Sequence, residues 1–215
     1  MPKWFACFRA SAVGWVVLVA AGVWWQCRYD YSQGPRGVVP PLLPEMAALE
    51  HPSGSPIIIM ALHPRCPCSR ASVGELDALL ERVPRRVDAV LLVCTPEAAT
   101  AEWREAAQRV ALKAPRARVV LDAGGEMAAR LGMMTSGAVA VYDAAGTLLF
   151  DGGLTPGRGV TGTSVESEQL AAALLQADGG VVPGARVIRA PVFGCGLVRC
   201  HEKPLNVASM TPGDD

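Results

Sequence analysis

The stretch PIIIMALHPRCPCSRASVGEL at residues 56–76 decides the fold of this chain. Residues 56–62 are almost wholly apolar, which is typical of a short strand buried on both faces of a sheet. From 72 to 83, apolar residues recur at helical spacing and predict an amphipathic helix. A turn with Cys66, Pro67 and Cys68 joins the two elements. The chain therefore passes from a buried strand, through two cysteines, into a helix.

Strand and helix patterns continue to alternate after this unit. Further strands are predicted at 87–93, 118–121, 138–142 and 147–150, the last two as a hairpin around the turn 143–146. Further helices are predicted at 95–113, 125–131 and 163–177. We expect the first to begin at Thr95-Pro96-Glu97 and the last at a capping box of Thr163 and Glu166. This order predicts a three-layer α/β fold with a mixed central sheet.

The cysteine turn lies where reactive thiols are expected. Active sites of open α/β sheets collect at the carboxyl ends of strands, and the start of a helix offers free N–H groups and a positive dipole end. Such surroundings stabilise a thiolate, and the neighbouring Arg65 would add positive charge. We therefore expect at least one activated thiol in this turn.

Three interpretations of Cys66 and Cys68 stay open at this point. The first is thiol–disulfide exchange, with Cys66 as the attacking thiol, Cys68 as the resolving thiol, and no cofactor. The second is a soft-metal site, such as one for copper, formed by His63, Cys66 and Cys68. The third is a structural bridge or a pair of cysteines without chemistry, which would leave a non-catalytic binding module.

Two blocks of the chain resemble the thioredoxin superfamily, and especially its membrane-tethered TlpA and ResA-like branch. The first is the strand, cysteine turn and helix up to Glu75-Leu76, and the second is LDAGGEMAARLG at 121–132 followed by VAVYDAAG at 139–146. More narrowly, CPCSR at 66–70, TSG at 135–137 and PVFGC at 191–195 resemble bacterial proteins labelled RedB. The resemblance implies a redox role with protein thiols or disulfides as partners.

The sequence departs from the superfamily's Cys-x-x-Cys pattern at two places. By position, the resemblance gives Cys66 the nucleophile role, whereas Ser69 stands at the second cysteine and Cys68 at an intervening position. The family's cis-proline, which helps to orient substrate and limits metal binding, is replaced by Gly137. Arg65, Pro67, Ser69 and Gly137 are therefore the expected supporting residues. The missing proline weakens the case for exchange and raises that for a metal somewhat, and thiol–disulfide exchange stays the preferred interpretation.

Three further cysteines have less definite interpretations. Cys195 and Cys200, with His201, could fold back to the site as a resolving thiol or as metal ligands, or the two cysteines could form a local bridge or stay free. A local bridge or free thiols is the preferred interpretation. Cys94 ends an apolar strand, where cysteine usually serves as a small buried apolar residue.

The N-terminal segment predicts a single transmembrane helix. Residues 10–25 carry no charge, and Lys3 and Arg9 precede them. Four aromatic residues, Trp24, Trp25, Tyr29 and Tyr31, lie at and just after the end of this run. This pattern indicates an N-terminus in the cytoplasm and a domain on the periplasmic side of a bacterial inner membrane. A cleaved signal peptide is the alternative, and it leads to the same compartment.

Composition supports one folded domain and argues against a nucleic-acid partner. The 20 basic and 20 acidic residues balance, whereas nucleic-acid surfaces usually need a basic excess. The predicted organisation is a cytoplasmic N-terminus at 1–9, an anchor at 10–27, a Pro/Gly-rich linker at 28–54, a thioredoxin-like domain at 55–178, and a Cys-containing irregular tail at 179–215.

Overall fold

The computed structural model describes residues 3–46, 49, 54–83, 86–177 and 186–197, with side chains from residue 11 onward. Its helices are α1 (Lys3–Asp30), α2 (Ser69–Arg82), α3 (Ala101–Ala111), α4 (Glu126–Arg130) and α5 (Val165–Gln176). Its strands are β1 (Ile57–Leu62), β2 (Asp88–Thr95), β3 (Arg118–Ala123), β4 (Ala138–Tyr142), β5 (Leu148–Gly152) and β6 (Ile188–Arg189).

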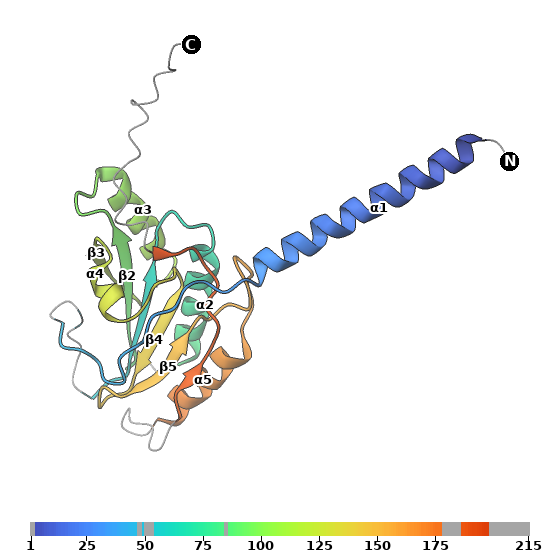
Figure 1. Cartoon of the computed structure of the whole chain (residues 1–215). Coiled ribbons are helices and arrows are strands. Elements are labelled where there is room, and N and C mark those ends of the chain that lie inside the picture. Colours follow the sequence, from blue (N-terminus) through green and yellow to red (C-terminus); the bar gives the residue numbers. More distant parts are fainter. Residues whose placement is uncertain (1–2, 47–48, 50–53, 84–85, 178–185, 198–215) are drawn as a thin grey trace, which may run out of the picture.

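The strands form one mixed sheet in the order β3-β2-β1-β4-β5-β6 (Figure 1). Strands β1, β2 and β3 are parallel to one another. Strand β4 is antiparallel to β1 and to β5, whereas β6 runs parallel to β5. Strand β1 is therefore central, and the cysteine turn leaves its carboxyl end.

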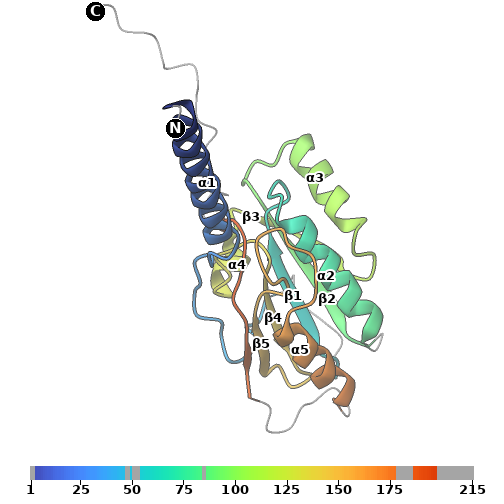
Figure 2. The ribbon, with the colours of Figure 1, turned by 90° about the vertical axis from the view of Figure 1, so that its right-hand side faces the viewer.

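The two faces of the sheet are covered by different parts of the chain. Ile58 and Met60 of β1 pack into a core with α2, α3 and α5. Ile57 and Ile59 point to the opposite face, where α4 and the C-terminal segment cover them. Figure 2 shows α2, α3 and α5 together on one side of the sheet, with α4 on the other. Because every residue of β1 is buried, the apolar run has no polar alternation.

This topology is that of a thioredoxin-like α/β domain, so the predicted thioredoxin-like fold with a mixed central sheet is confirmed. A parallel strand pair leads through the cysteine turn into α2, and the antiparallel hairpin of β4 and β5 completes the sheet. The carboxyl end of β1 and the start of α2 thus place the cysteines at one end of the sheet.

Two predicted helix starts were wrong. Thr95 is still part of β2, where it pairs with Ala123 and its carbonyl accepts a hydrogen bond from Gly124. Helix α3 therefore begins after Thr100. At α5, Ser164 is the N-cap: its hydroxyl accepts from the N–H of Ser167 at 3.2 Å, which replaces the predicted box of Thr163 and Glu166.

Part of the predicted tail belongs to the sheet. Ile188 and Arg189 form β6, which pairs with β5, and residues up to Leu197 pack beside the cysteine turn. Apolar residues drive this packing, because Val192 and Leu197 are buried in the core on the α4 face. Cys200 and His201 lie outside the described residues.

The segment predicted as a linker also packs on the domain. Gly34 donates a backbone hydrogen bond to Val192, and Leu43 donates one to Gly146. Arg36 forms an ion pair of 3.0 Å with Asp151. Residues 34–43 are therefore part of the folded unit.

Helix α1 projects from the domain (Figure 1), and large apolar side chains along it, such as Trp15 and Leu18, are exposed. Within the residues that the structure describes, no helix combines the length and the apolar character needed to cross a membrane. The anchor at 10–27 stays a prediction.

Candidate active site

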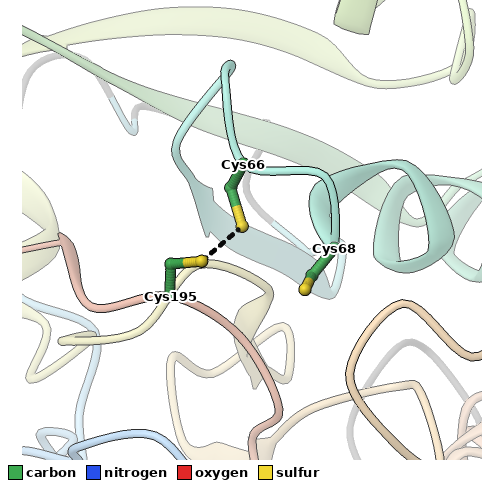
Figure 3. A group of neighbouring side chains, drawn as sticks. All are labelled: Cys66, Cys68 and Cys195. Atoms are coloured by element: carbon green, nitrogen blue, oxygen red, sulfur yellow. Dashed lines mark hydrogen bonds between the residues drawn. The ribbon is translucent and has the colours of Figure 1, made fainter. Parts of the chain in front are cut away.

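Three cysteine thiols meet at the end of the sheet. Cys66 lies in the turn after β1, Cys68 is the N-cap of α2, and Cys195 comes from the C-terminal segment. Their three sulfur atoms lie within 4.8 Å of one another, and the sulfurs of Cys66 and Cys195 are 3.1 Å apart. Figure 3 shows these two side chains pointing toward each other, with Cys68 beside them. All three are free thiols.

Backbone pairing holds Cys195 against the turn. The carbonyl of Cys195 accepts from the N–H of Ser136 at 2.8 Å, and Leu197 donates to Met134 at 2.8 Å. Gly194 permits this close approach, because a Cβ atom there would lie 2.0 Å from the Ser136 carbonyl oxygen. The segment before β4 therefore positions a thiol that is 129 residues away from Cys66 in sequence.

The Cys66 thiol is stabilised in its ionised form. Burial opposes ionisation, yet the pKa of Cys66 is lowered. The cause is a set of hydrogen bonds to its sulfur from the Cys195 thiol and from the backbone N–H groups of Cys195, Cys68 and Ser69. Two of these N–H groups belong to the start of α2, where helix N–H groups lack partners within the helix.

The other two thiols hold their protons more strongly. Burial raises the pKa of Cys68, and the negative charge of Cys66 raises it further. Burial, followed by the hydrogen bond to Cys66, raises the pKa of Cys195 to about 12. Of the three thiols, Cys66 is therefore the one that ionises most readily.

Arg158 is a site residue that no sequence pattern indicated. Its guanidinium donates to the carbonyl of Gly194 at 2.5 Å and to Ser32 at 3.1 Å. Its positive charge lowers the pKa of both Cys68 and Cys195, against the stronger effect of burial. Arg158 thus connects the segment that holds Cys195 to Ser32 through its hydrogen bonds. Its positive charge also favours the ionised forms of Cys68 and Cys195.

Ser69, the residue at the superfamily's second cysteine position, stabilises the turn. Its buried hydroxyl donates to the carbonyl of His63 at 2.9 Å and contacts the hydroxyl of Ser136 at 2.8 Å. Ser136 in turn accepts from the N–H of His63 at 2.9 Å. This network connects the turn to the segment that holds Cys195.

Gly137 lies where the resemblance expects a cis-proline. Its φ of +91° is in the region that favours glycine, and no cis peptide bond occurs among the described residues. A Cβ atom at Gly137 would lie 2.6 Å from the Ser72 hydroxyl oxygen. Gly137 also donates to the Ala61 carbonyl, so it holds the start of β4 against the carboxyl end of β1.

Arg65 and His63 point away from the thiols and toward α3. Arg65 forms an ion pair of 2.8 Å with Glu102, and its guanidinium lies 4.3 Å from the Trp103 ring centroid. His63 Nδ1 accepts from the Arg65 N–H, and its ring meets Trp103 edge-on. Burial, and then the charge of Arg65, lower the pKa of His63. Pro67 is exposed at the tip of the turn.

These contacts change the expected roles of several residues. The charge of Arg65 is not among the causes that lower the pKa of Cys66. Among the described residues, the group that could hold a metal is Cys66, Cys68 and Cys195, without His63. In the structure Cys195 is a free thiol that contacts Cys66.

Cys94 is buried, as expected, but it is also disulfide-bonded. An apolar strand pattern carries no signal for such a bond. Cysteine pairing depends on which segments the fold brings together.

The fold and the three thiols together define a thioredoxin-like α/β domain with a candidate cysteine-based site. No protein-family model matches the chain, and no curated protein matches it. Solved structures do match. A hypothetical protein of Sinorhizobium meliloti has a TM-score of 0.53 at 19% identity and covers 78% of this chain and 94% of its own. An uncharacterised conserved protein of Geobacillus kaustophilus has a TM-score of 0.54 at 21% identity and covers 81% and 94%.

A secreted disulfide oxidoreductase of Mycobacterium tuberculosis, homologous to Escherichia coli DsbE, matches with a TM-score of 0.40 at 21% identity. That match covers 56% of this chain and 80% of the other. At these identities the similarity of the first two structures concerns the fold, and function must be argued from the site.

Proposed function

We propose that this domain catalyses thiol–disulfide exchange, with Cys66 as the attacking thiolate and Cys195 as the resolving thiol. The observation that carries the proposal is the 3.1 Å contact between the sulfurs of Cys66 and Cys195, at a site where backbone N–H groups stabilise the Cys66 thiolate. Exchange needs a thiolate and a second thiol within reach, and both are present here.

The reaction proceeds in two displacements. The Cys66 thiolate attacks one sulfur of a substrate disulfide, forms a bond to it and expels the other sulfur as a thiolate, which takes a proton. Cys195, after losing its proton, attacks the Cys66 sulfur, forms the Cys66–Cys195 disulfide and expels the second substrate thiolate. Two electrons pass to the substrate, which is reduced while the cysteine pair is oxidised. The reverse sequence oxidises a substrate dithiol.

The electrostatics of the cluster favour this order. Charge on Cys66 is one of the causes that raise the pKa of Cys195. Formation of the mixed disulfide removes that charge, so Cys195 ionises more readily at the step in which it attacks. Cys68 was the expected resolving thiol. We now give this role to Cys195, because its thiol is hydrogen-bonded to Cys66 at 3.1 Å.

Trapping the mixed disulfide tests these roles. The exposed Cys27 is first changed to serine, and the reduced protein is mixed with hydroxyethyl disulfide, quenched in acid and analysed by mass spectrometry. Cys195→Ser should accumulate the adduct on Cys66, whereas Cys68→Ser should convert it to an internal disulfide. Accumulation in Cys68→Ser instead would assign resolution to Cys68. If Cys66 reacts no faster than a free cysteine, the exchange proposal fails.

A soft-metal site is the second candidate function, and the cluster of three sulfurs within 4.8 Å supports it. Thiolates select Cu(I), for which three sulfur ligands are suitable. Anaerobic titration of the reduced protein with Cu(I), against a competing chelator, tests this candidate. Copper binding that is lost in Cys195→Ser and kept in His63→Ala would support it, and equal binding by both variants would contradict it.

We further propose that the domain acts outside the cytoplasm, attached to a bacterial inner membrane by the segment 10–27, as a TlpA/ResA-like protein of the RedB type. Its partners would be protein thiols or disulfides. The disulfide at Cys94 supports an oxidising compartment, and the exposed apolar side chains of α1 support contact with lipid. Fractionation of cells that produce the whole chain or residues 31–215 tests the attachment: only the whole chain should sediment with membranes.

A further inference from the structure

A pocket of about 410 Å³ lies beside the proposed nucleophile, between the start of α2 and the second half of α3. Cys66 and Ser69 form one of its walls. Its volume falls in the range of pockets that hold small molecules, about 300–1,000 Å³. A ligand in this pocket would therefore lie against the residue that we propose to attack disulfides.

The charge of the pocket has one sign. Arg65, Arg70, Arg109 and Lys113 line it, and no aspartate or glutamate does. Two of these cations have carboxylates near them: Arg65 pairs with Glu102 at 2.8 Å, and Arg109 lies 3.9 Å from Glu105. Within the part of the chain that the structure describes, Arg70 and Lys113 have no ion-pair partner.

The pocket also has an apolar side. Val73, Ala106 and Val110 line it and are buried. The cationic residues Arg70, Arg109 and Lys113 are exposed. A ligand with a small apolar body and peripheral carboxylates matches this distribution, because its body can leave water while each carboxylate meets a guanidinium or ammonium group.

We infer that this pocket binds low-molecular-weight disulfides that carry carboxylates, and that these are a substrate class of the site. The inference rests on the proposed function. Binding in the pocket brings the substrate disulfide to Cys66, whose thiolate forms a bond to one sulfur and expels the other as a carboxylate-bearing thiolate. Cys195 then displaces the second thiolate, and both thiolates leave as thiols after protonation. Each turnover oxidises one cysteine pair and reduces one small disulfide.

Single-turnover rates of the reduced, full-length protein with three probes test the inference. Oxidised glutathione is anionic, hydroxyethyl disulfide is neutral, and cystamine is cationic. The rate with each probe is divided by its rate with a free model thiol, so that intrinsic reactivity cancels. At low salt the corrected rate for oxidised glutathione should exceed that for hydroxyethyl disulfide by about tenfold, with cystamine slowest, and salt should reduce the difference.

Charge variants connect this preference to the pocket. In the double variant Arg109→Gln with Lys113→Gln, the corrected ratio of the anionic to the neutral probe should fall toward one. Arg130→Gln, on the exposed face of α4, removes an arginine charge outside the pocket and should leave the ratio unchanged. An unchanged ratio in the double variant overturns the inference, and so does an equal fall in Arg130→Gln.

Two further results separate this inference from the proposed function. If the neutral probe reacts at Cys66 but the anionic probe has no advantage, exchange stands and the pocket inference fails. If no probe reacts, exchange fails, and titration with S-methylglutathione followed by NMR still reports on the pocket: shifts confined to its residues support binding, and their absence overturns it. If a disulfide within an acidic protein segment reacts faster than the neutral probe and oxidised glutathione does not, the substrate is a protein. That result contradicts the inference of a small-molecule disulfide.

Discussion

Cys66 depends on donors from two distant parts of the chain, the start of α2 and the segment around Cys195. Its lowered pKa means that the thiolate persists to lower pH than for an ordinary cysteine. The alkylation rate of Cys66, followed by peptide mass spectrometry, should therefore reach half of its maximum at a lower pH than that of a cysteine in an unstructured peptide. Cys195→Ala removes the thiol donor and should move the midpoint to higher pH. Cys27→Ala, at an exposed free thiol, is the control.

Gly137 is a second residue at which a single added atom, the Cβ of alanine, should change the stability of the protein. Gly137→Ala places a Cβ atom 2.6 Å from the Ser72 hydroxyl oxygen at a φ of +91°, and we expect a loss of about 1–3 kcal/mol in the free energy of unfolding. Urea denaturation measures it. Gly74→Ala is the matched control: Gly74 lies inside α2 with open space around it, so alanine should stabilise by about 0.5–1 kcal/mol. Equal stability of the two variants would contradict this account.

At the scale of elements, the start of α5 distinguishes the observed cap from the predicted one. Ser164→Ala removes the side-chain acceptor for the Ser167 N–H and should lower the free energy of unfolding by about 1 kcal/mol. Thr163→Ala changes the neighbouring hydroxyl, which the sequence had favoured as the cap, and should stay within about 0.5 kcal/mol. A larger effect at Thr163 would restore the predicted capping box. Thermal unfolding of both variants decides between them.

The elements themselves followed from the sequence wherever the apolar pattern was long or regular. The runs at 56–62 and 138–142 became β1 and β4 because a continuous apolar strand must be covered on both faces. Boundaries were less predictable. Thr95 has the features of an N-cap, but sheet pairing with Ala123 holds it in β2, so tertiary hydrogen bonding overrode local preference. Strand β6 was missed because two residues carry no readable periodicity.

At the scale of the whole molecule, the N-terminal segment contributes to the stability of the domain. Arg36 pairs with Asp151 at 3.0 Å and donates to the carbonyls of Asp151 and Ala190. Arg36→Gln should lower the free energy of unfolding by about 1–3 kcal/mol, because it leaves two carbonyls and a largely buried carboxylate with fewer partners.

Arg189→Gln is the control for this prediction. Arg189 contacts the same carboxylate at 3.1 Å, but its side chain is 67% exposed. Its loss should change the stability by less than about 1 kcal/mol. If urea denaturation gives the same loss in the free energy of unfolding for both variants, the segment around Arg36 contributes nothing beyond a surface ion pair.

The sequence by itself determined the order of the elements from β1 to α5, the mixed sheet and the position of Cys66 and Cys68 between β1 and α2. These features depend on local periodicity and on residues that are neighbours in the chain. Only the tertiary structure decided that Cys195 faces Cys66, that Arg158 ties its segment in place, and that Arg65 turns toward Glu102. The physical reason is that these contacts join segments far apart in sequence, and packing and backbone pairing around Ser136, not local preference, bring Cys195 to Cys66.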